Sequence, residues 1–284
     1  MKISVSSYSF EKLLHAGKMT QLDCIRKAKE IGFDAIEFAD ILAPEGITKE
    51  EYAEALAKEC KSLEMPVSNF TFGADFIKGS GGNVRLEIER VKKMVDIAVI
   101  LGTDLIRHDA TTGDGRSFDT VLPMIADACR EVTIYASSRG VRTTVENHGF
   151  FCQDSDRMEK LYNRVGYENF GLLMDMGNFL CADEAPEKAV GRLAPYAFYV
   201  HAKDFHVKHA MLPDPGEGFF RSRSGNYLRG AIIGHGDVPV LHCIRALKNA
   251  NYDGYIAIEF EGMEENIPAI TIGLHNLRNY IEKA

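Results

Sequence analysis

Four short apolar segments in the second half of the sequence each end in a side chain that can bind a metal ion. VRTTVEN supplies Glu146, FGLLMDMGN supplies Asp175, FYVHAKD supplies His201 and YIAIEFEG supplies Glu259. One such side chain after one strand is commonly a helix cap or a surface ion-pair partner. Three carboxylates that face one point, however, repel one another strongly unless a cation or a proton compensates them. The four residues together therefore predict a site for one divalent metal ion.

The predicted ligand set contains three carboxylates, one imidazole and no cysteine. Oxygen-rich ligation with a single nitrogen favours Mn²⁺, Mg²⁺ or Co²⁺ over the thiolate ligation of a structural zinc site. The imidazole makes Mn²⁺ the first choice, with Mg²⁺, Co²⁺ and Zn²⁺ as the alternatives.

A metal ion in such a site predicts a particular first chemical step. It can hold two oxygens of a hydroxy-ketone, polarise the carbonyl and acidify the adjacent C–H bond. A carboxylate on one face can then remove the proton to give a metal-stabilised enediolate, and a carboxylate on the other face can return it. The outcome is epimerisation or isomerisation of a sugar, or the loss of a β-substituent in a lyase. The ligands therefore predict the first step and leave the product open.

Five further residues are candidates for the same site. His148 follows the first ligand by two residues, so strand alternation directs it to the same side, as a substrate ligand or general acid. His108 ends the fourth predicted strand and is a candidate substrate ligand. Lys203, two residues after the third ligand, could bind a substrate oxygen or balance the carboxylates. His235 and Arg223 lie in the long segment after the strand of His201 and are candidate substrate ligands. We expect Arg223 to meet a substrate oxygen, the alternative being a solvated or subunit-contact arginine.

The elements that must position these residues alternate between strands and helices along the whole chain. The strands are short and apolar, which is typical of strands buried in a parallel sheet. Eight strand–helix units in 284 residues predict a (β/α)8 TIM barrel, whose active sites lie at the carboxyl ends of the strands. A doubly wound open sheet is the alternative, but a barrel explains better how four strand ends meet. The predicted strands are 2–8, 34–38, 66–72, 104–109, 141–147, 170–175, 197–204 and 255–260.

The spacing of the ligands indicates where the barrel carries an insertion. Successive ligands are 29, 26 and 58 residues apart, so the first two intervals each fit one strand–helix unit. The last interval holds an insertion after the seventh strand, residues 206–237, with three arginines and a pair of phenylalanines. Loops of this length in a compact domain are usually lids, binding loops or interfaces. No linker-like stretch divides the chain, so residues 1–284 are predicted to form a single domain.

The composition argues against several classes of partner. The formal net charge is −8 and the pI is about 5.6, which disfavours nucleic acid and anionic membranes. No apolar run is long enough to span a bilayer, and the first residues indicate a strand rather than a signal peptide. The six cysteines include no CxxC pair, as expected for reduced thiols of a cytoplasmic protein. The expected ligand is a small-molecule sugar or sugar derivative.

At the ligand-bearing segments the chain resembles the xylose isomerase-like (β/α)8 superfamily, described broadly as sugar phosphate isomerases and epimerases. The resemblance covers essentially the whole chain and rests on VENHG, MDMGN, HAKDF and IEFEG, with GHGDV before the seventh helix. It implies that Glu146, Asp175, His201 and Glu259 bind one divalent metal. Similarity to the ketose 3-epimerases of this superfamily implies that Glu146 and Glu259 also form the acid/base pair.

One position departs from two branches of that superfamily. Asn178 stands where ketose 3-epimerases and the endonuclease IV branch have a histidine, which weakens both assignments, the nuclease most. We therefore expect a metal-dependent sugar isomerase or epimerase. The alternatives are a lyase similar to inosose dehydratases or to the large subunit of C-glycoside deglycosidases, and a non-catalytic sugar-binding barrel. Similar barrels form homo-oligomers, and the deglycosidases add a small partner subunit, so both kinds of assembly are expectations here.

Overall fold

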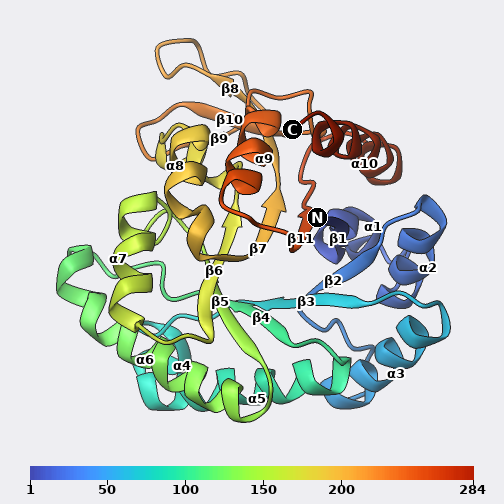
Figure 1. Ribbon diagram of the computed structural model, residues 1–284, viewed down its shortest axis with the longest axis vertical. Coiled ribbons are helices and arrows are strands. Elements are labelled where there is room, and N and C mark those ends of the chain that lie inside the picture. The colour runs from blue at the N-terminus through green and yellow to red at the C-terminus, as the bar shows by residue number, and fades with distance from the viewer.

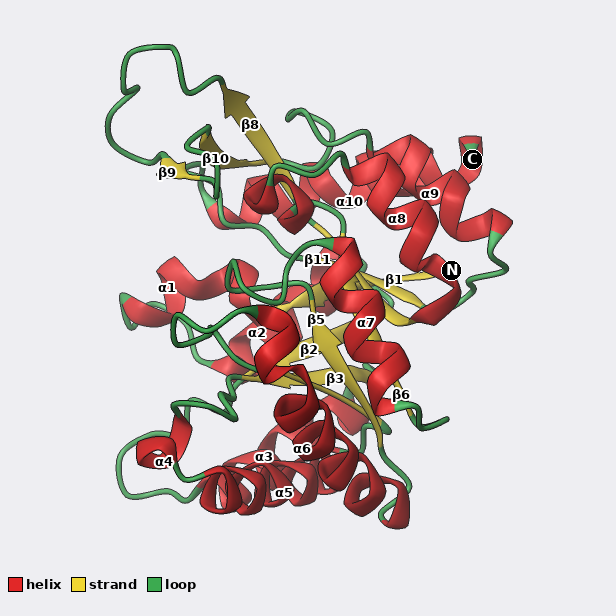
Figure 2. Cartoon of the chain, turned by 90° about the vertical axis from the view of Figure 1, so that its left-hand side faces the viewer, coloured by secondary structure: helices red, strands yellow, loops and turns green.

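The computed structural model describes residues 1–284 and closes eight parallel strands into a barrel with the order β1-β11-β7-β6-β5-β4-β3-β2. Helices surround this barrel (Figures 1 and 2). The closed sheet confirms the predicted (β/α)8 fold and excludes the open doubly wound alternative. The barrel strands are β1 (Lys2–Ser6), β2 (Ala35–Ala39), β3 (Val67–Phe72), β4 (Leu105–His108), β5 (Arg142–Glu146), β6 (Phe170–Asp175), β7 (Ala197–Ala202) and β11 (Tyr255–Ile258).

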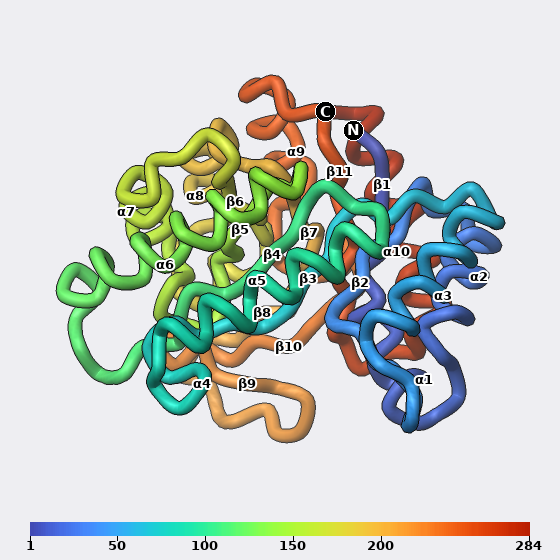
Figure 3. The backbone as a smooth tube through the Cα atoms, turned by 90° about the horizontal axis from the view of Figure 1, so that it is seen from below, coloured from blue at the N-terminus to red at the C-terminus, as the bar shows by residue number.

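One main helix follows each barrel strand, and neighbouring helices such as α3, α5 and α6 lie side by side along the outside (Figure 3). Short helical turns fill several of the connections: η1 (Ser7–Phe10), α1 (Glu11–His15), α4 (Gly79–Gly82), η2 (Asn178–Ala182) and η3 (Ala194–Tyr196). No helix combines the length and apolar character that crossing a membrane requires. The main helices are α2 (Gln21–Ile31), α3 (Lys49–Ser62), α5 (Val84–Leu101), α6 (Phe118–Ser138), α7 (Ser155–Val165), α8 (Pro186–Leu193), α9 (Val240–Asn249) and α10 (Asn266–Lys283).

Local sequence explains where the first helices begin and end. The side chain of Thr20 accepts a hydrogen bond from the N–H of Asp23, whose carboxylate in turn accepts from the N–H of Thr20. Thr48 and Glu51 repeat this capping box at the start of α3. The helix α2 ends at Gly32, which has the left-handed φ of 99° that glycine adopts most easily.

Side chains alternate along the strands between an apolar core outside the barrel and stacked layers inside it. Outward-facing side chains join the helices in one apolar core of 66 buried residues. Inside the barrel, a small apolar cluster contains Leu105, Leu173, Tyr199 and Ala257, all of them buried. The inward-facing positions of the next layer are two residues further along the same strands, toward their carboxyl ends. The layer at the carboxyl ends of the strands therefore packs on buried side chains, and not on solvent inside the barrel.

The insertion after β7 forms a small antiparallel sheet of its own, with strand order β8-β10-β9, which rises above the barrel (Figure 2). Its strands are β8 (Asp204–Lys208), β9 (Phe220–Arg221) and β10 (Tyr227–Ala231). At its base, Asp204 accepts hydrogen bonds of 2.8–3.0 Å from the backbone N–H groups of Phe205, Gly234, Gly236 and Val238. The insertion is thus an ordered sheet that is closed at its base by one carboxylate.

Candidate metal centre

Four predicted ligands meet at the carboxyl ends of neighbouring strands. Glu146 ends β5, Asp175 ends β6, His201 lies in β7 and Glu259 follows β11, and these strands are consecutive in the barrel. One ligand atom from each lies within 4.8 Å of the others. Glu146 and Glu259 are the outer members of the row. They lie at the two ends of this row, with the aspartate and the histidine between them.

His201 turns one ring nitrogen toward the other three ligands. Its Nδ1 lies 3.7 Å from Glu146 Oε1, 3.7 Å from Glu259 Oε2 and 3.8 Å from Asp175 Oδ2. The other nitrogen, Nε2, lies 3.0 Å from both carboxylate oxygens of Glu37 on β2. Because a carboxylate only accepts, Nε2 donates its proton to Glu37, which leaves Nδ1 as the ring nitrogen that faces the other three ligands.

Asp175 is held by backbone contacts that leave one carboxylate oxygen free. The side-chain amide of Asn147 accepts from the N–H of Asp175 at 2.8 Å and donates to its carbonyl at 2.9 Å. The oxygen Oδ1 accepts from the N–H groups of Gly177 and Asn178 at 2.8 and 2.9 Å. Gly177 has no room for a side chain, because a Cβ there would lie 2.8 Å from the carbonyl oxygen of Lys203. These contacts direct Oδ2 toward His201.

The donor atoms at the centre fit a divalent cation. Asp175 Oδ2 and His201 Nδ1 are both buried and make no hydrogen bond, which is costly for polar atoms unless another group engages them. Burial raises the pKa of Asp175 to about 7, and the negative charges of Glu146 and Glu259 add to the rise. A cation between Asp175 Oδ2 and His201 Nδ1 would give both atoms a binding partner, and its charge would offset the repulsion among the carboxylates. This cluster can bind a metal ion, and Mn²⁺ as its identity stays a prediction.

Glu146 is paired with a buried arginine that the sequence interpretation did not include. Arg107 on β4 lies 2.6 Å from Glu146 Oε2 and 3.0 Å from Asp109 Oδ1. Burial alone would raise the pKa of Glu146, but Arg107 and His201 outweigh it and lower this pKa to about 2. Glu146 is therefore ionised at neutral pH.

The register between β4 and β5 explains why Arg107, rather than its neighbour His108, faces the site. Arg107 is in register with Thr144, which precedes Glu146 by two residues and faces the same side of the sheet. His108 is in register with Val145 and faces outward, fully buried, with its ring 5.6 Å from that of Phe76. The prediction that His108 binds substrate is therefore wrong, because its side chain packs in the outer core.

Lys203 balances the carboxylates on the other side of the centre, as one of its predicted roles required. Its Nζ lies 2.5 Å from Glu259 Oε2, 3.4 Å from Glu261 Oε2 and 3.5 Å from Asp175 Oδ2. Burial lowers the pKa of Lys203, but these carboxylates outweigh burial and raise it well above its ordinary value. Each outer glutamate therefore has a cationic partner: Arg107 on Glu146 and Lys203 on Glu259.

Asn178, noted in the sequence only as a departure, connects both halves of the site. Its Nδ2 donates to Glu146 Oε1 at 2.9 Å, and its Oδ1 accepts from Lys203 Nζ at 3.4 Å. Asn178 therefore positions the two charged groups relative to each other.

His148 lies at the opening of the site, where strand alternation placed it. It lines a cavity of about 290 Å³ over the ligands, here called the mouth cavity, together with Arg107, Glu146, Lys203 and Glu259. Its Nδ1 is 3.4 Å from Asp109 Oδ1, and half of its side chain is exposed. Burial lowers the pKa of His148, but the contact with Asp109 outweighs it and raises the pKa. The imidazole can therefore carry a proton beside the ligands.

Two residues of the insertion lie away from this cavity. Arg223 donates to Asp154 Oδ2 at 2.9 Å and to the carbonyl of Phe150, so it ties the insertion to the loop after β5. His235 is exposed beyond β10, with its N–H bonded to the carbonyl of Ile232. Neither side chain lines the mouth cavity, so the structure does not bring them to the metal centre, and their contact with substrate stays a prediction.

Comparisons with known proteins agree with this architecture. The family model described as xylose isomerase-like TIM barrel matches residues 25–280. No curated protein matches the sequence. Solved structures with a similar fold include the IolI protein with a bound zinc atom, which is 16% identical, with a TM-score of 0.79 and 100% of this chain and 99% of that chain covered.

Two further structures have the same fold. One is 3-keto-D-glucoside 4-epimerase, YcjR, from E. coli, with 17% identity, a TM-score of 0.74, and 98% of this chain and 99% of that chain covered. The other is the probable 3-DHS dehydratase AsbF from Bacillus anthracis, with 17% identity, a TM-score of 0.76 and the same coverage. At these identities the similarity shows the fold, and function has to be argued from the site.

Proposed function

The chain belongs to the xylose isomerase-like TIM barrel family, and from this premise we propose that it is a divalent-metal-dependent isomerase or epimerase of a keto-sugar or polyol. The observation that carries the proposal is the placement of two glutamates on opposite sides of the ligand row, each with a cationic partner. Epimerases and a zinc-bound protein among the similar structures support it.

The bound ion would polarise a substrate carbonyl and make the adjacent C–H bond more acidic. Glu259 or Glu146 then accepts the proton from one face of that carbon, and the other glutamate returns a proton to the opposite face. Return to the same carbon inverts it, and return to the neighbouring carbon isomerises the sugar. Arg107 and Lys203 hold the two carboxylates in place before the substrate arrives. The glutamate that accepts the proton acts in its ionised form, and the glutamate that returns one must first take up a proton from solvent.

The test is deuterium exchange in D₂O with Mn²⁺ and a panel of ketoses and keto-glycosides, followed by NMR. We expect deuterium to enter one carbon beside a carbonyl with the natural chain. Glu146→Gln and Glu259→Gln each keep a side-chain oxygen and should abolish the exchange. Glu54→Gln, an exposed carboxylate on α3, is the matched control. Exchange that persists in both site variants would sink the proposal, and metal binding measured alongside separates lost ligation from lost proton transfer.

A lyase is the second candidate, and the position of His148 favours it. In this reaction a glutamate removes the proton, a C=C bond forms, and the bond to the β-substituent breaks. The protonated imidazole of His148 gives its proton to the leaving group. Release of a substituent from the substrate would select the lyase, provided that His148→Asn stops this release while deuterium exchange continues. Tight metal and sugar binding without any exchange would instead favour a non-catalytic barrel. Homo-oligomers and a small partner subunit stay predictions.

A further inference from the structure

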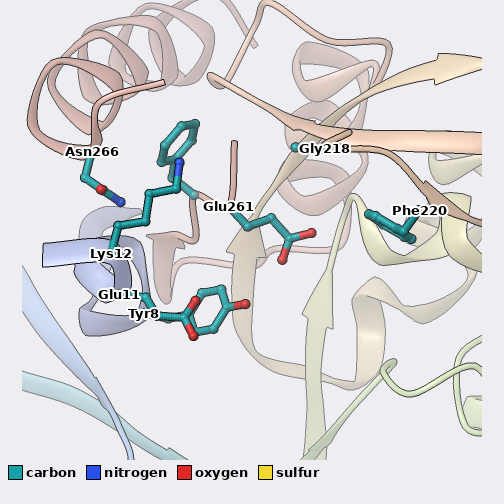
Figure 4. A pocket seen from close by; sticks show the side chains of 9 residues that line it. Tyr8, Glu11, Lys12, Gly218, Phe220, Glu261 and Asn266 are labelled. Atoms are coloured by element: carbon teal, nitrogen blue, oxygen red, sulfur yellow. The ribbon is translucent and has the colours of Figure 1, made fainter. Parts of the chain in front are cut away.

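A second cavity lies beside the mouth cavity and shares two wall residues with it. This side cavity also measures about 290 Å³. Tyr8 and Glu261 line both spaces, and Figure 4 shows the Tyr8 hydroxyl and the Glu261 carboxylate pointing into the same region. Single-ligand pockets in proteins measure roughly 300–1,000 Å³, so the two spaces together can hold a two-part ligand. The lining residues are Tyr8, Glu11, Lys12, Gly218, Phe220, Gly230, Phe260, Glu261 and Asn266.

One wall of the side cavity comes from the insertion, and close backbone packing holds this wall in place. Gly230 on β10 forms a parallel bridge with Gly262, and a Cβ at Gly230 would lie 2.6 Å from the carbonyl of Glu261. Gly218 lies against the side chain of Met263. The ring of Phe220 is fixed by an edge contact to Phe205, with centroids 5.6 Å apart. The wall is therefore built in advance of any ligand.

The lining combines aromatic rings with hydrogen-bonding groups. Phe220 and Phe260 supply apolar surface, and the hydroxyl of Tyr8 makes no hydrogen bond within the protein. Lys12 is already engaged, because its Nζ donates to the carbonyl of Gly262 at 2.5 Å. Glu11 and Glu261 add two negative charges. With Lys12 as the one cation, the lining has an excess of one negative charge, which disfavours a phosphate. It suits a ring that has hydroxyl groups at its edge and apolar C–H groups on its face.

The two cavities are also connected electrostatically. Lys203 Nζ lies between Glu259 Oε2 at the metal centre and Glu261 Oε2 at the shared wall, at 2.5 and 3.4 Å. A substrate carbon placed at Glu259 would therefore have the rest of its molecule directed past Glu261. Any group attached on that side enters the side cavity rather than solvent.

We propose that the side cavity binds a second, hydroxylated ring joined to the keto-sugar, so that the substrate is a ring-linked keto-glycoside and not a free or phosphorylated sugar. This assignment rests on the proposed function for its keto-sugar half. The second ring can be a sugar or a phenol, since both have an apolar face and hydroxyl groups.

The first experiment compares exchange on three probes: methyl, phenyl and glucosyl 3-keto-β-D-glucoside. We expect kcat/KM to be at least about tenfold higher for a ring-bearing probe than for the methyl probe. Phe220→Ala should bring this ratio close to one. Met211→Ala, at an 88% exposed position of the same insertion, should keep it. Equal kcat/KM for all three probes, or an unchanged ratio in Phe220→Ala, would overturn the assignment. Whichever of the phenyl and glucosyl probes has the higher kcat/KM identifies the chemical class of the second ring.

A second experiment needs no catalysis. Metal-free protein is mixed with phenyl β-D-glucoside or cellobiose, and saturation transfer from protein to ligand protons is recorded by NMR. We expect transfer to one ring of the ligand, lost in Phe220→Ala and kept in Met211→Ala. Absence of transfer with both ligands refutes the second-ring site. Transfer without any deuterium exchange would refute the proposed function alone, so the two failures are distinguishable.

Discussion

The Nε2 atom of His201 lies 3.0 Å from both carboxylate oxygens of Glu37, and both side chains are buried. Glu37 also accepts a hydrogen bond from Asn69 Nδ2 at 3.0 Å. The carboxylate therefore sets both the orientation and the tautomer of the imidazole, which is the usual outer-shell arrangement of a metal-binding histidine.

Glu37→Gln should weaken metal binding without removing a ligand. The amide cannot hold the imidazole proton as strongly, and loss of such partners typically costs about 10–100-fold in metal affinity. Competition with a chromogenic chelator measures this, with the exposed Glu54→Gln as the matched control. Equal affinities of the two variants would show that Glu37 serves the fold alone.

Removing the charge of Arg107 should destabilise the metal-free protein. Arg107→Met leaves the buried carboxylates of Glu146 and Asp109 without their cation, a change that costs about 3–5 kcal/mol in buried pairs. A divalent metal ion should restore part of this loss, because it supplies positive charge beside Glu146. Denaturant unfolding with and without Mn²⁺ measures both effects.

The control for Arg107→Met is Arg85→Met, an exposed pair with Glu131 that should change stability little. Arg107→Lys serves as the milder variant if the methionine variant does not fold. Stability of Arg107→Met equal to that of Arg85→Met would contradict the compensating role.

A side chain at Gly177 should disturb the metal centre. Its Cβ would lie 2.8 Å from the carbonyl oxygen of Lys203, and overpacking of this kind costs about 1–3 kcal/mol. We expect Gly177→Ala to lower the melting temperature and the metal affinity. Gly191→Ala is the matched control, because nothing lies within 4 Å of a Cβ in that helix and alanine should stabilise it by about 0.5–1 kcal/mol. The same outcome for both variants would refute the close approach at Gly177.

Asp75 should make two loops of the barrel mouth sensitive to acid. It accepts hydrogen bonds from the N–H groups of Ile77, Lys78 and Thr112 and from the hydroxyl of Thr111, at 2.8–3.1 Å. Burial raises the pKa of Asp75, but these donors outweigh burial and lower it below its ordinary value. The folded state therefore prefers the ionised form.

The stabilisation from Asp75 is complete above the ordinary pKa of about 4 and is lost as the pH falls through the lower folded value. Hydrogen-exchange protection factors of the Ile77, Lys78 and Thr112 amides should therefore decline below about pH 4. Asp75→Asn should remove this dependence, and the exposed Asp127→Asn should leave it intact. A decline of the same size in Asp75→Asn would rule out this carboxylate as the cause.

The positions of the four ligands could be predicted from the sequence because a parallel barrel brings its strand ends together whatever its helices are. Of their partners, Lys203 could also be predicted, because it follows His201 by two residues, but the roles of Arg107 and Asn178 could not, since they depend on register and contacts between strands. His108 is chemically more conspicuous than Arg107, but pairing with Thr144 turns the arginine inward. Only the contacts of Asn178 reveal that it bridges Glu146 and Lys203.

The insertion shows the other limit of sequence reasoning. Its length predicted a lid, a binding loop or an interface, but it did not predict a three-stranded sheet. The side cavity depends on Gly230 packing against Glu261 and Gly262, a contact between segments about thirty residues apart. No local pattern of apolar residues encodes such a contact, because it is made by backbone atoms.

The four hydrogen bonds accepted by Asp204 have an evolutionary consequence. They bring residue 205 and residues 234–238 together at one carboxylate, so the segment between them leaves and re-enters the barrel at the same place. Closing a loop costs little more free energy when it grows longer, and exposed loops tolerate replacement. The four candidate ligands lie outside residues 206–233, so the exposed positions of this segment can change in descendants of this chain while the candidate metal centre is retained.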